Sequence, residues 1–168
     1  MQATRSDLVL VPVTRFDRER LADLFERMSR RSRYQRFLHP KPRLTPDELD
    51  YFTDLDHRRH DALAAVDPSD GSFAGVARYA VLDDAGRAAD LAFAVADAWQ
   101  GRGVGTMLLE ALLPRAEANG IERLIALTLT DNAPARALLR RFGFRKAGTT
   151  HGVAEMHLEV RAAIRLAA

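Results

Sequence analysis

The sequence predicts an α+β fold in which helices flank one mixed, mostly antiparallel sheet. Two observations carry this prediction. Short apolar strands are joined by turn residues, as in antiparallel hairpins, and one strand–helix–strand segment provides a parallel crossover. The 168 residues, 47% of them hydrophobic and 29% charged, match the size and composition of a globular domain. We therefore expect a single domain over residues 1–168, without the roughly 18-residue apolar run of a membrane helix.

The elements of the first half have clear local start and stop signals. Thr14 and Thr45 stand where helix N-caps are expected, and Pro46 follows Thr45 as the first helical residue. The turn residues from Asp83 to Gly86 predict a hairpin. The elements expected here are strands over 7–13, 60–66, 72–82 and 87–96, and helices over 17–30 and 46–55.

In the second half, glycines mark where helices end. Gly120 and Gly143 each follow an apolar periodic segment, which is the position favoured by a left-handed cap residue. The elements expected here are a helix that opens within 99–106 and runs to 119, a strand over 123–129, a helix over 132–142, and a closing hairpin of 144–149 and 153–160.

Charge and cysteine content exclude several classes of protein. The isoelectric point is near 9.4, but the net charge is only +2, because the basic residues are almost all arginine. We therefore expect no nucleic-acid partner. Cysteine is absent, which excludes disulfides and thiolate metal sites, and no apolar leader opens the chain, so a cytoplasmic location is expected. The oligomeric state stays open, a homodimer included.

The strongest chemical signal is a glycine-rich turn between a strand and a helix. The first amides of a helix have no internal partner and carry the positive end of its dipole, so they bind anions. Glycine lets an anion approach the backbone, and the arrangement suits a diphosphate. The alternative is a tight turn without a ligand. The turn consists of Gln100, Gly101, Arg102, Gly103, Val104, Gly105 and Thr106.

Two common phosphate motifs do not fit this turn. A Walker loop needs Gly-Lys-Ser/Thr, and the segment has no lysine. A dinucleotide fingerprint needs a third glycine where this chain has Thr106, and the strand that should precede it is missing upstream. The anion is therefore expected to belong to another class of ligand.

The turn resembles the Q/R-x-x-G-x-G/A loop of the GNAT superfamily, the acyl-CoA-dependent N-acyltransferases. The segment from Asn132 to Phe144 is similar to the N-x-x-A-x-x-L-Y-x-x-x-G-F helix of the same family. The resemblance covers nearly the whole chain and implies the GNAT fold, with acetyl-CoA as the acyl donor and no metal. A narrower likeness over 32–37, 44–45 and 56–63 resembles bacterial protein-lysine acetyltransferases, whose domain also occurs fused to ADP-forming acyl-CoA synthetases. This sequence of 168 residues contains no synthetase half, so we expect a stand-alone catalytic domain.

The resemblance also assigns the cofactor contacts. It places the pyrophosphate on the backbone from Gln100 to Thr106, with the Arg102 side chain near a phosphate. It places the pantetheine arm beside Val95 and Ala96, and gives Asn132 a hydrogen bond to that arm. The alternative for Asn132 is an N-cap of the following helix.

Catalysis in this family is direct attack of an amine on the thioester, helped by a base. In the protein-acetylating branch a glutamate precedes the loop, and Asp90 takes its place here. The alternative for Asp90 is a solvated hairpin acid. The family's tyrosine, the usual proton donor, is replaced by Leu139. This leaves three functions open: acetylation of a protein lysine, which the branch favours, acetylation of a small amine, and CoA binding with little turnover.

Other polar residues are candidates for acceptor contact. The basic stretch from Arg27 to Arg43 is either a substrate-steering surface or a solvated loop, and within it Arg33 and Arg36 are the expected substrate contacts. Glu155 is a weaker candidate for facing the amine. The histidines and aspartates over 56–61 lack a complete set of metal ligands, so we expect a local polar cluster there.

Overall fold

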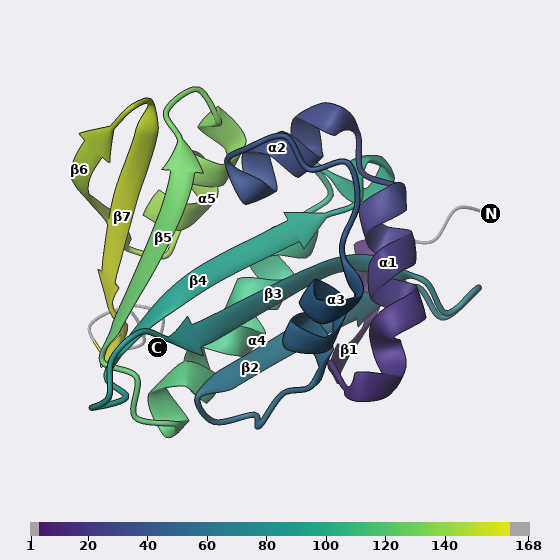
Figure 1. The fold of residues 1–168 in the computed structure, drawn as a ribbon, viewed down its shortest axis with the longest axis horizontal. Coiled ribbons are helices and arrows are strands. Elements are labelled where there is room, and N and C mark those ends of the chain that lie inside the picture. The colour runs from purple at the N-terminus through teal and green to yellow at the C-terminus, as the bar shows by residue number, and fades with distance from the viewer. Residues whose placement is uncertain (1–3, 162–168) are drawn as a thin grey trace.

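The structure, a computed structural model, describes residues 4–161, and these contain one seven-stranded sheet in the order β1-β2-β3-β4-β5-β7-β6 (Figure 1). Neighbouring strands are antiparallel except for β4 and β5, which are parallel. The predicted fold class is therefore confirmed. The strands are β1 (Val9–Pro12), β2 (His60–Val66), β3 (Phe73–Val81), β4 (Ala88–Val95), β5 (Arg123–Leu129), β6 (Arg145–Thr150) and β7 (Val153–Glu159).

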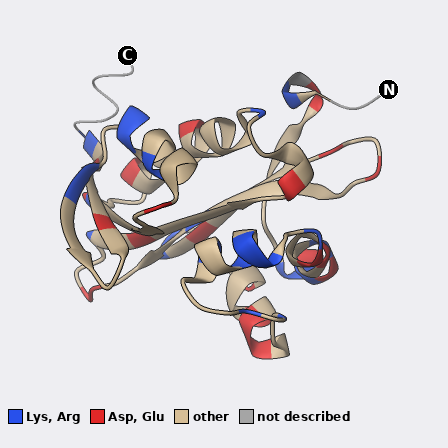
Figure 2. Ribbon diagram, turned by 90° about the horizontal axis from the view of Figure 1, so that it is seen from above, with Lys and Arg blue, Asp and Glu red and all other residues tan. Residues whose placement is uncertain are grey.

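Helices cover both faces of the sheet, as the edge-on view shows (Figure 2). One face carries α1 (Arg18–Glu26), α2 (Arg30–Phe37) and α3 (Pro46–Thr53), and the other carries α4 (Val104–Ala118) and α5 (Ala133–Arg141). Basic and acidic residues are interspersed over both layers (Figure 2). Within residues 4–161, no helix has the length and apolar character that crossing a membrane requires.

The core lies mainly between α4 and the sheet. Leu108 and Leu112 of α4 are fully buried, as is Ala77 of β3. Burying one such leucine stabilises the fold by about 2 kcal/mol, so α4 is held firmly on strands β2 to β4. The start of α4 is thereby fixed relative to the end of β4.

The predicted helix over 17–30 is divided in the structure. A 3₁₀ turn precedes α1, α1 ends at Glu26, and a separate helix begins after Ser29, whose hydroxyl accepts a hydrogen bond from the Ser32 amide at 3.2 Å. The basic stretch interpreted as a possible solvated loop is therefore helical as far as Phe37. The helix α2 forms because tertiary contacts stabilise it, including an edge-on contact between the Phe37 and Phe25 rings, whose centroids are 5.8 Å apart.

Candidate functional site

The central feature of the site is the divergence of β4 and β5. The two strands pair only over Ala88–Asp90 and Arg123–Ile125, and beyond that point they separate (Figure 1). Just past the end of β4, the Ala96 amide bonds to the Ala74 carbonyl at 2.9 Å, so backbone groups of alternate residues face β3. The backbone groups of Phe93 and Val95 therefore face the opening, where an extended ligand can pair as an added strand.

The opening leads into a cleft of about 590 Å³. It is lined by β4 on one side, β5 and α5 on the other, the glycine-rich turn at one end, and α2 above. Such a volume lies within the range of small-molecule and cofactor sites. The cleft therefore brings the predicted loop, Val95 and Asn132 together in one place.

The glycine-rich turn presents the unpaired start of α4. Gly103 is the N-cap with φ +79°, and the first helical bond runs from the Met107 amide to the Gly103 carbonyl at 3.1 Å. No side chain of the described residues caps this end. The amides of Val104, Gly105 and Thr106 thus lie ahead of the first helical bond, at the positive end of the dipole, as an anion site requires.

The three glycines of the turn have different reasons to be there. Gly101 and Gly103 adopt left-handed backbone conformations that glycine tolerates best. Gly105 has ordinary backbone angles, but a Cβ at this position would lie 2.8 Å from Leu138 Cδ2. Gly105 therefore allows close packing of α4 on α5, which is a structural role.

The Gln100 side chain braces the turn. Its Nε2 lies 3.1 Å from both the Val95 carbonyl and Ser32 Oγ, and 3.3 Å from a carboxylate oxygen of Asp97. Burial raises the pKa of Asp97, but hydrogen bonds from Ser29 and Ser32 outweigh burial and leave this pKa below its ordinary value. This network joins the turn to the start of α2. Because the Gln100 backbone amide also donates to the Asp97 carbonyl, at 3.3 Å, neither amide group of Gln100 is left for a phosphate.

Arg102 and Asn132 are placed differently. Arg102 is exposed and stacks on the Trp99 ring at 5.4 Å, from which its guanidinium can swing to a phosphate. The Asn132 Oδ1 accepts a hydrogen bond from the Ala135 amide at 3.3 Å, which is an N-cap of α5. Because Asn132 also lines the cleft, its N-cap role leaves the side-chain amide group for a ligand.

Asp90 marks the point where the sheet opens. It is the last β4 residue paired with β5, its side chain is 32% exposed, and its carboxylate lies 3.6 Å from Nη2 of Arg78. In register it lies beside Ile125, which in turn pairs with His157. Asp90 and the hydrogen-bonded pair Glu155–His157 therefore share the face of the sheet that α1 to α3 leave partly open.

No tyrosine replaces the missing proton donor. Leu139 is 1% exposed, and none of the three tyrosines lines the cleft. The Tyr79 hydroxyl is bonded to Asn119 at 2.7 Å and donates to the Arg58 carbonyl at 3.2 Å. Any proton that the leaving thiolate takes up must therefore come from another source.

The two arginines expected at the acceptor site have separate positions. Arg33 donates to the backbone carbonyls of Phe25, Met28, Glu26 and Pro42 at 2.9–3.1 Å and does not line the cleft. Its contacts favour a structural role that fixes the segment before α3. Arg36 does line the cleft. Burial first, and then the charge of Arg78, lower the pKa of Arg36 to about 10, so it stays cationic at neutral pH.

Sequence reasoning missed Arg78, which lies 3.6 Å from the Asp90 carboxylate and lines a small pocket beside the cleft. A period of two along β3 places Arg78 on the same face as Ala74 and Val76, where an apolar residue is expected. An arginine at an inward-facing strand position is unusual, and this feature of the sequence could have identified Arg78 as a candidate. The polar cluster over 56–61 is not local as expected, because Arg115 and Asn119, near the end of α4, donate to the Asp61 carboxylate and to the His57 carbonyl. Asp61 is fully buried between His57 and Arg115, and among residues 4–161 no group of side chains fits a metal.

A sheet split between two parallel strands, with a glycine-rich turn and unpaired helix amides at its open end, is the architecture of an acyl-CoA-dependent N-acyltransferase. Residues 21–144 match the Acetyltransferase (GNAT) family. The chain belongs to this family.

Individual relatives agree. Acetyltransferase PA5475 of Pseudomonas aeruginosa is 30% identical over 139 residues, which are 82% of this chain and 74% of that protein. Acetyltransferase Pat of Mycolicibacterium smegmatis is 31% identical over 134 residues, 80% of this chain but 40% of that longer protein. The crystal structure of the GNAT domain of S. lividans PAT has a TM-score of 0.84 at 32% identity, with 90% of each chain covered.

These findings confirm the resemblance to the bacterial protein acetyltransferase branch. The chain is an N-acetyltransferase that uses acetyl-CoA as its donor.

Proposed function

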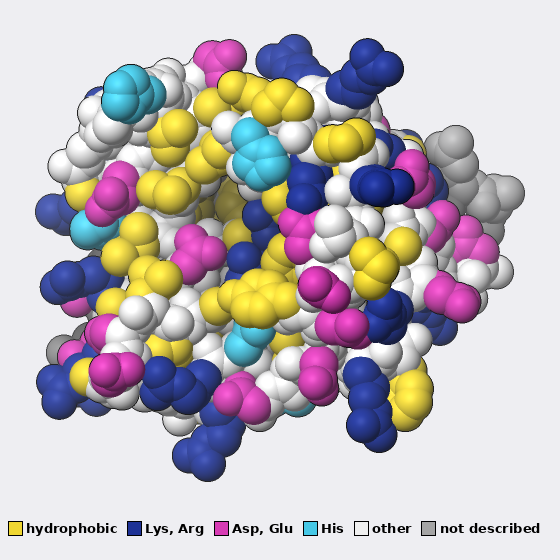
Figure 3. Space-filling model, viewed as in Figure 1, with side chains coloured by type: hydrophobic (Ala, Val, Ile, Leu, Met, Phe, Trp, Pro, Cys, Tyr) yellow, Lys and Arg dark blue, Asp and Glu magenta, His cyan; other side chains and the backbone are white. Residues whose placement is uncertain are grey.

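We propose that this acetyltransferase acetylates lysine side chains of proteins, with the whole chain acting as one N-acetyltransferase domain. The observation that supports a peptide acceptor is the shape and charge of the acceptor side, by which we mean the open sheet face beside the cleft where the amine would bind. Leu127, Glu155 and His157 lie on an open strand face, where Leu127 is 48% exposed. Figure 3 shows the hollow on this face, with hydrophobic side chains around it and basic ones at its edge. A polyamine would instead favour a deep acidic pocket.

In this proposal acetyl-CoA lies along the cleft. The pyrophosphate contacts the backbone amides from Gly101 to Thr106, with Arg102 beside it, while Gln100 holds the turn in shape. The pantetheine pairs with Val95, passes Ala96, and receives a hydrogen bond from Asn132. The amides at the start of α4 support this arrangement, because they lie ahead of the first helical bond and no side chain of the described residues caps them.

Asp90 is the proposed base. At pH 7 only about one lysine amine in 2,500 is neutral, a handicap of about 4.6 kcal/mol, so removal of the proton must accompany attack. Asp90 is the last β4 residue paired with β5, and Leu91 and Ala92, which follow it, line the cleft, so we place Asp90 at the edge of the cleft beside the thioester. A bridging water makes up the length by which aspartate falls short of glutamate.

The test is thiol release from acetyl-CoA with a lysine-peptide mixture and a panel of small amines. We expect Asp90→Asn to lower kcat/KM by about 100-fold or more while CoA affinity stays unchanged. Glu155→Gln is the matched substitution on β7, two strands from β4 on the same face of the sheet, and should retain most activity.

Three results would contradict the proposal in different ways. Loss of activity only in Glu155→Gln would move the base to β7. Turnover of small amines alone would exclude a protein acceptor. Tight CoA binding without release from any acceptor would instead indicate a regulatory CoA-binding protein.

A further inference from the structure

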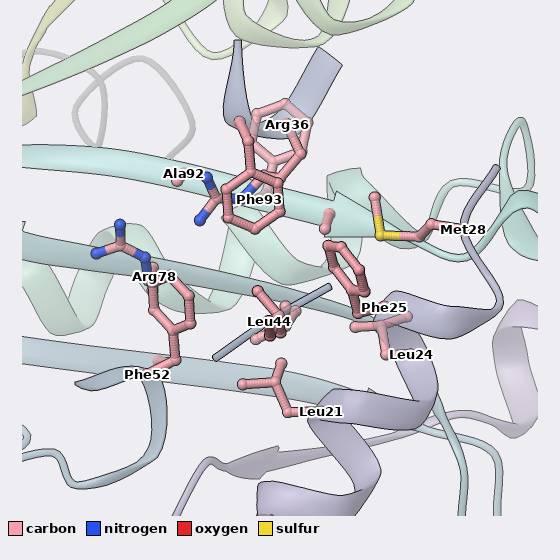
Figure 4. Close-up of a pocket in the computed structure, with 14 residues that line it drawn as sticks. Leu21, Leu24, Phe25, Met28, Arg36, Leu44, Phe52, Arg78, Ala92 and Phe93 are labelled. Atoms are coloured by element: carbon pink, nitrogen blue, oxygen red, sulfur yellow. The ribbon is translucent and has the colours of Figure 1, made fainter. Parts of the chain in front are cut away.

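A small pocket beside the cleft contains two guanidinium groups in largely apolar surroundings. It lies between α1, α2, α3 and the sheet, and it shares Arg36 and residues 92–94 of β4 with the cleft. Figure 4 shows the guanidinium groups of Arg36 and Arg78 at the same end of this pocket, near Ala92, with Leu21 and Leu24 toward the other end.

The donors of Arg78 are poorly satisfied. Its side chain is 13% exposed, and its Nε and Nη1 are buried without a hydrogen-bond partner among residues 4–161. Its Nη2 lies 3.6 Å from the Asp90 carboxylate, which is an ion-pair distance but too long for a hydrogen bond. Buried donors are paired in most proteins, so two buried nitrogens without a partner, and a third held only at ion-pair distance, indicate an anion site.

Positive charge in this pocket exceeds negative charge. Arg36 and Arg78 lie near each other, and of the carboxylates in residues 4–161 only Asp90 is among the charges that raise the pKa of Arg36. His60 Nε2 is also buried, with no partner in the part of the chain that the structure describes. Burial together with the charge of Arg78 lowers the pKa of His60 to about 4. His60 is therefore neutral at pH 7 and adds no charge of either sign.

Aromatic rings offset only part of this imbalance. The guanidinium of Arg78 lies 5.0 Å from the Phe52 ring, and that of Arg36 lies 4.8 Å from the Phe37 ring. Cation–π contacts use the flat faces of the guanidinium groups and leave their N–H donors, which lie in the plane, without acceptors.

We propose that Arg36 and Arg78 bind a carboxylate of the acceptor, so that the preferred acceptor carries an acid group close to its reacting amine. Planar guanidinium forks suit a carboxylate, and the free volume of about 40 Å³ takes a group of a few heavy atoms rather than a whole molecule. Arg78 lies beside Asp90. An amine close to the acceptor's carboxylate therefore lies within reach of Asp90, the proposed base.

This inference rests on the proposed amine acetylation. The carboxylate has two possible sources: the α-carboxylate of a free amino acid, or an acidic side chain beside a lysine in a peptide.

The experiment compares matched acid and amide acceptors. L-leucine is paired with L-leucinamide, and a peptide containing Lys-Glu with the same peptide containing Lys-Gln. We expect the acid to be preferred in kcat/KM by roughly 10- to 100-fold in at least one pair, as for charge-assisted hydrogen bonds. The pair that shows the preference identifies the source of the carboxylate. Equal use of acid and amide in both pairs would overturn the proposal.

Variants connect the preference to these arginines. Arg36→Gln and Arg78→Gln should each bring the acid-to-amide ratio close to one, and Arg36→Lys should keep part of the preference. Arg30→Gln, an exposed position on the same helix, should keep all of it. A substitution of Arg78 can also change how Asp90 acts as a base. Because such a change affects the acid and the amide acceptor equally, it cancels in the acid-to-amide ratio of kcat/KM. A preference that survives both glutamine substitutions would exclude this site.

A binding measurement separates this proposal from the proposed function. Calorimetry of CoA-loaded wild-type protein with N-acetyl-L-leucine and its amide, and with the acetylated Lys-Glu and Lys-Gln peptides, tests recognition without turnover. Tighter binding of the acid form in either pair supports carboxylate recognition even if no acetyl transfer is detected. Equal affinities within both pairs would overturn it even in an active enzyme.

Discussion

The cofactor side and the acceptor side of the cleft are built in different ways. On the cofactor side, backbone amides from one continuous segment, between the end of β4 and the start of α4, form the binding surface. On the acceptor side, side chains from α2, β3 and β4 meet through tertiary packing, as Arg36, Arg78 and Asp90 do. The first arrangement depends on main-chain amides that glycine leaves accessible, and the second depends on which side chains tertiary packing brings together.

The largest expected effect tests the backbone arrangement. Gly103→Asp should weaken CoA binding by about 100-fold, because a carboxylate at the N-cap occupies the anion site and repels a diphosphate. Gly103→Asn is the matched control, since asparagine accepts the same left-handed conformation and caps the helix without charge. Isothermal titration with CoA measures both, and melting curves report folding.

Equal CoA affinities for the two Gly103 variants would mean that charge at this end of α4 is unimportant. The cofactor would then bind elsewhere, and the contrast between the two sides of the cleft would disappear.

The same contrast explains what the sequence could predict. The strands over 60–66 and 123–129, the hairpins and the glycine-rich turn follow local signals and lie where they were expected. The separate helix α2 was missed, because its stability comes from contacts such as Phe37 with Phe25 rather than from a strong apolar stripe. Arg33 and Arg36 are three residues apart in one basic helix, and only the fold directs one to backbone carbonyls and the other to the cleft.

Gln100 connects the two sides, and its substitution sharpens the comparison. Gln100→Met removes the hydrogen bonds to Val95, Ser32 and Asp97 while keeping a side chain of similar length. We expect CoA affinity to fall about tenfold, because the turn loses its brace although every backbone amide remains. Ser32→Ala removes one acceptor of the network and should have an effect of about twofold. Unchanged affinity in Gln100→Met would show that the turn holds its shape without α2.

The smallest effect concerns the charge of the acceptor side. Burial first, and then the charge of Arg78, lower the pKa of His60 from 6.5 to about 4 in the folded protein. The unfolded chain therefore binds a proton at higher pH than the folded one. This stability contribution is complete above pH 6.5 and is lost as the pH falls toward 4. Because the ring is partly exposed, solvent screening reduces the loss at pH 5 to about 1 kcal/mol.

His60→Phe keeps an aromatic ring beside Tyr51 and cannot titrate. Its free energy of unfolding should fall less between pH 7.5 and pH 5 than that of the wild type, as urea denaturation at the two values measures. Carboxylates elsewhere titrate in both proteins, so the difference between the two isolates the histidine. An identical pH dependence would mean that His60 is not held neutral. The positive charge of Arg78 would then be better compensated than the contacts indicate.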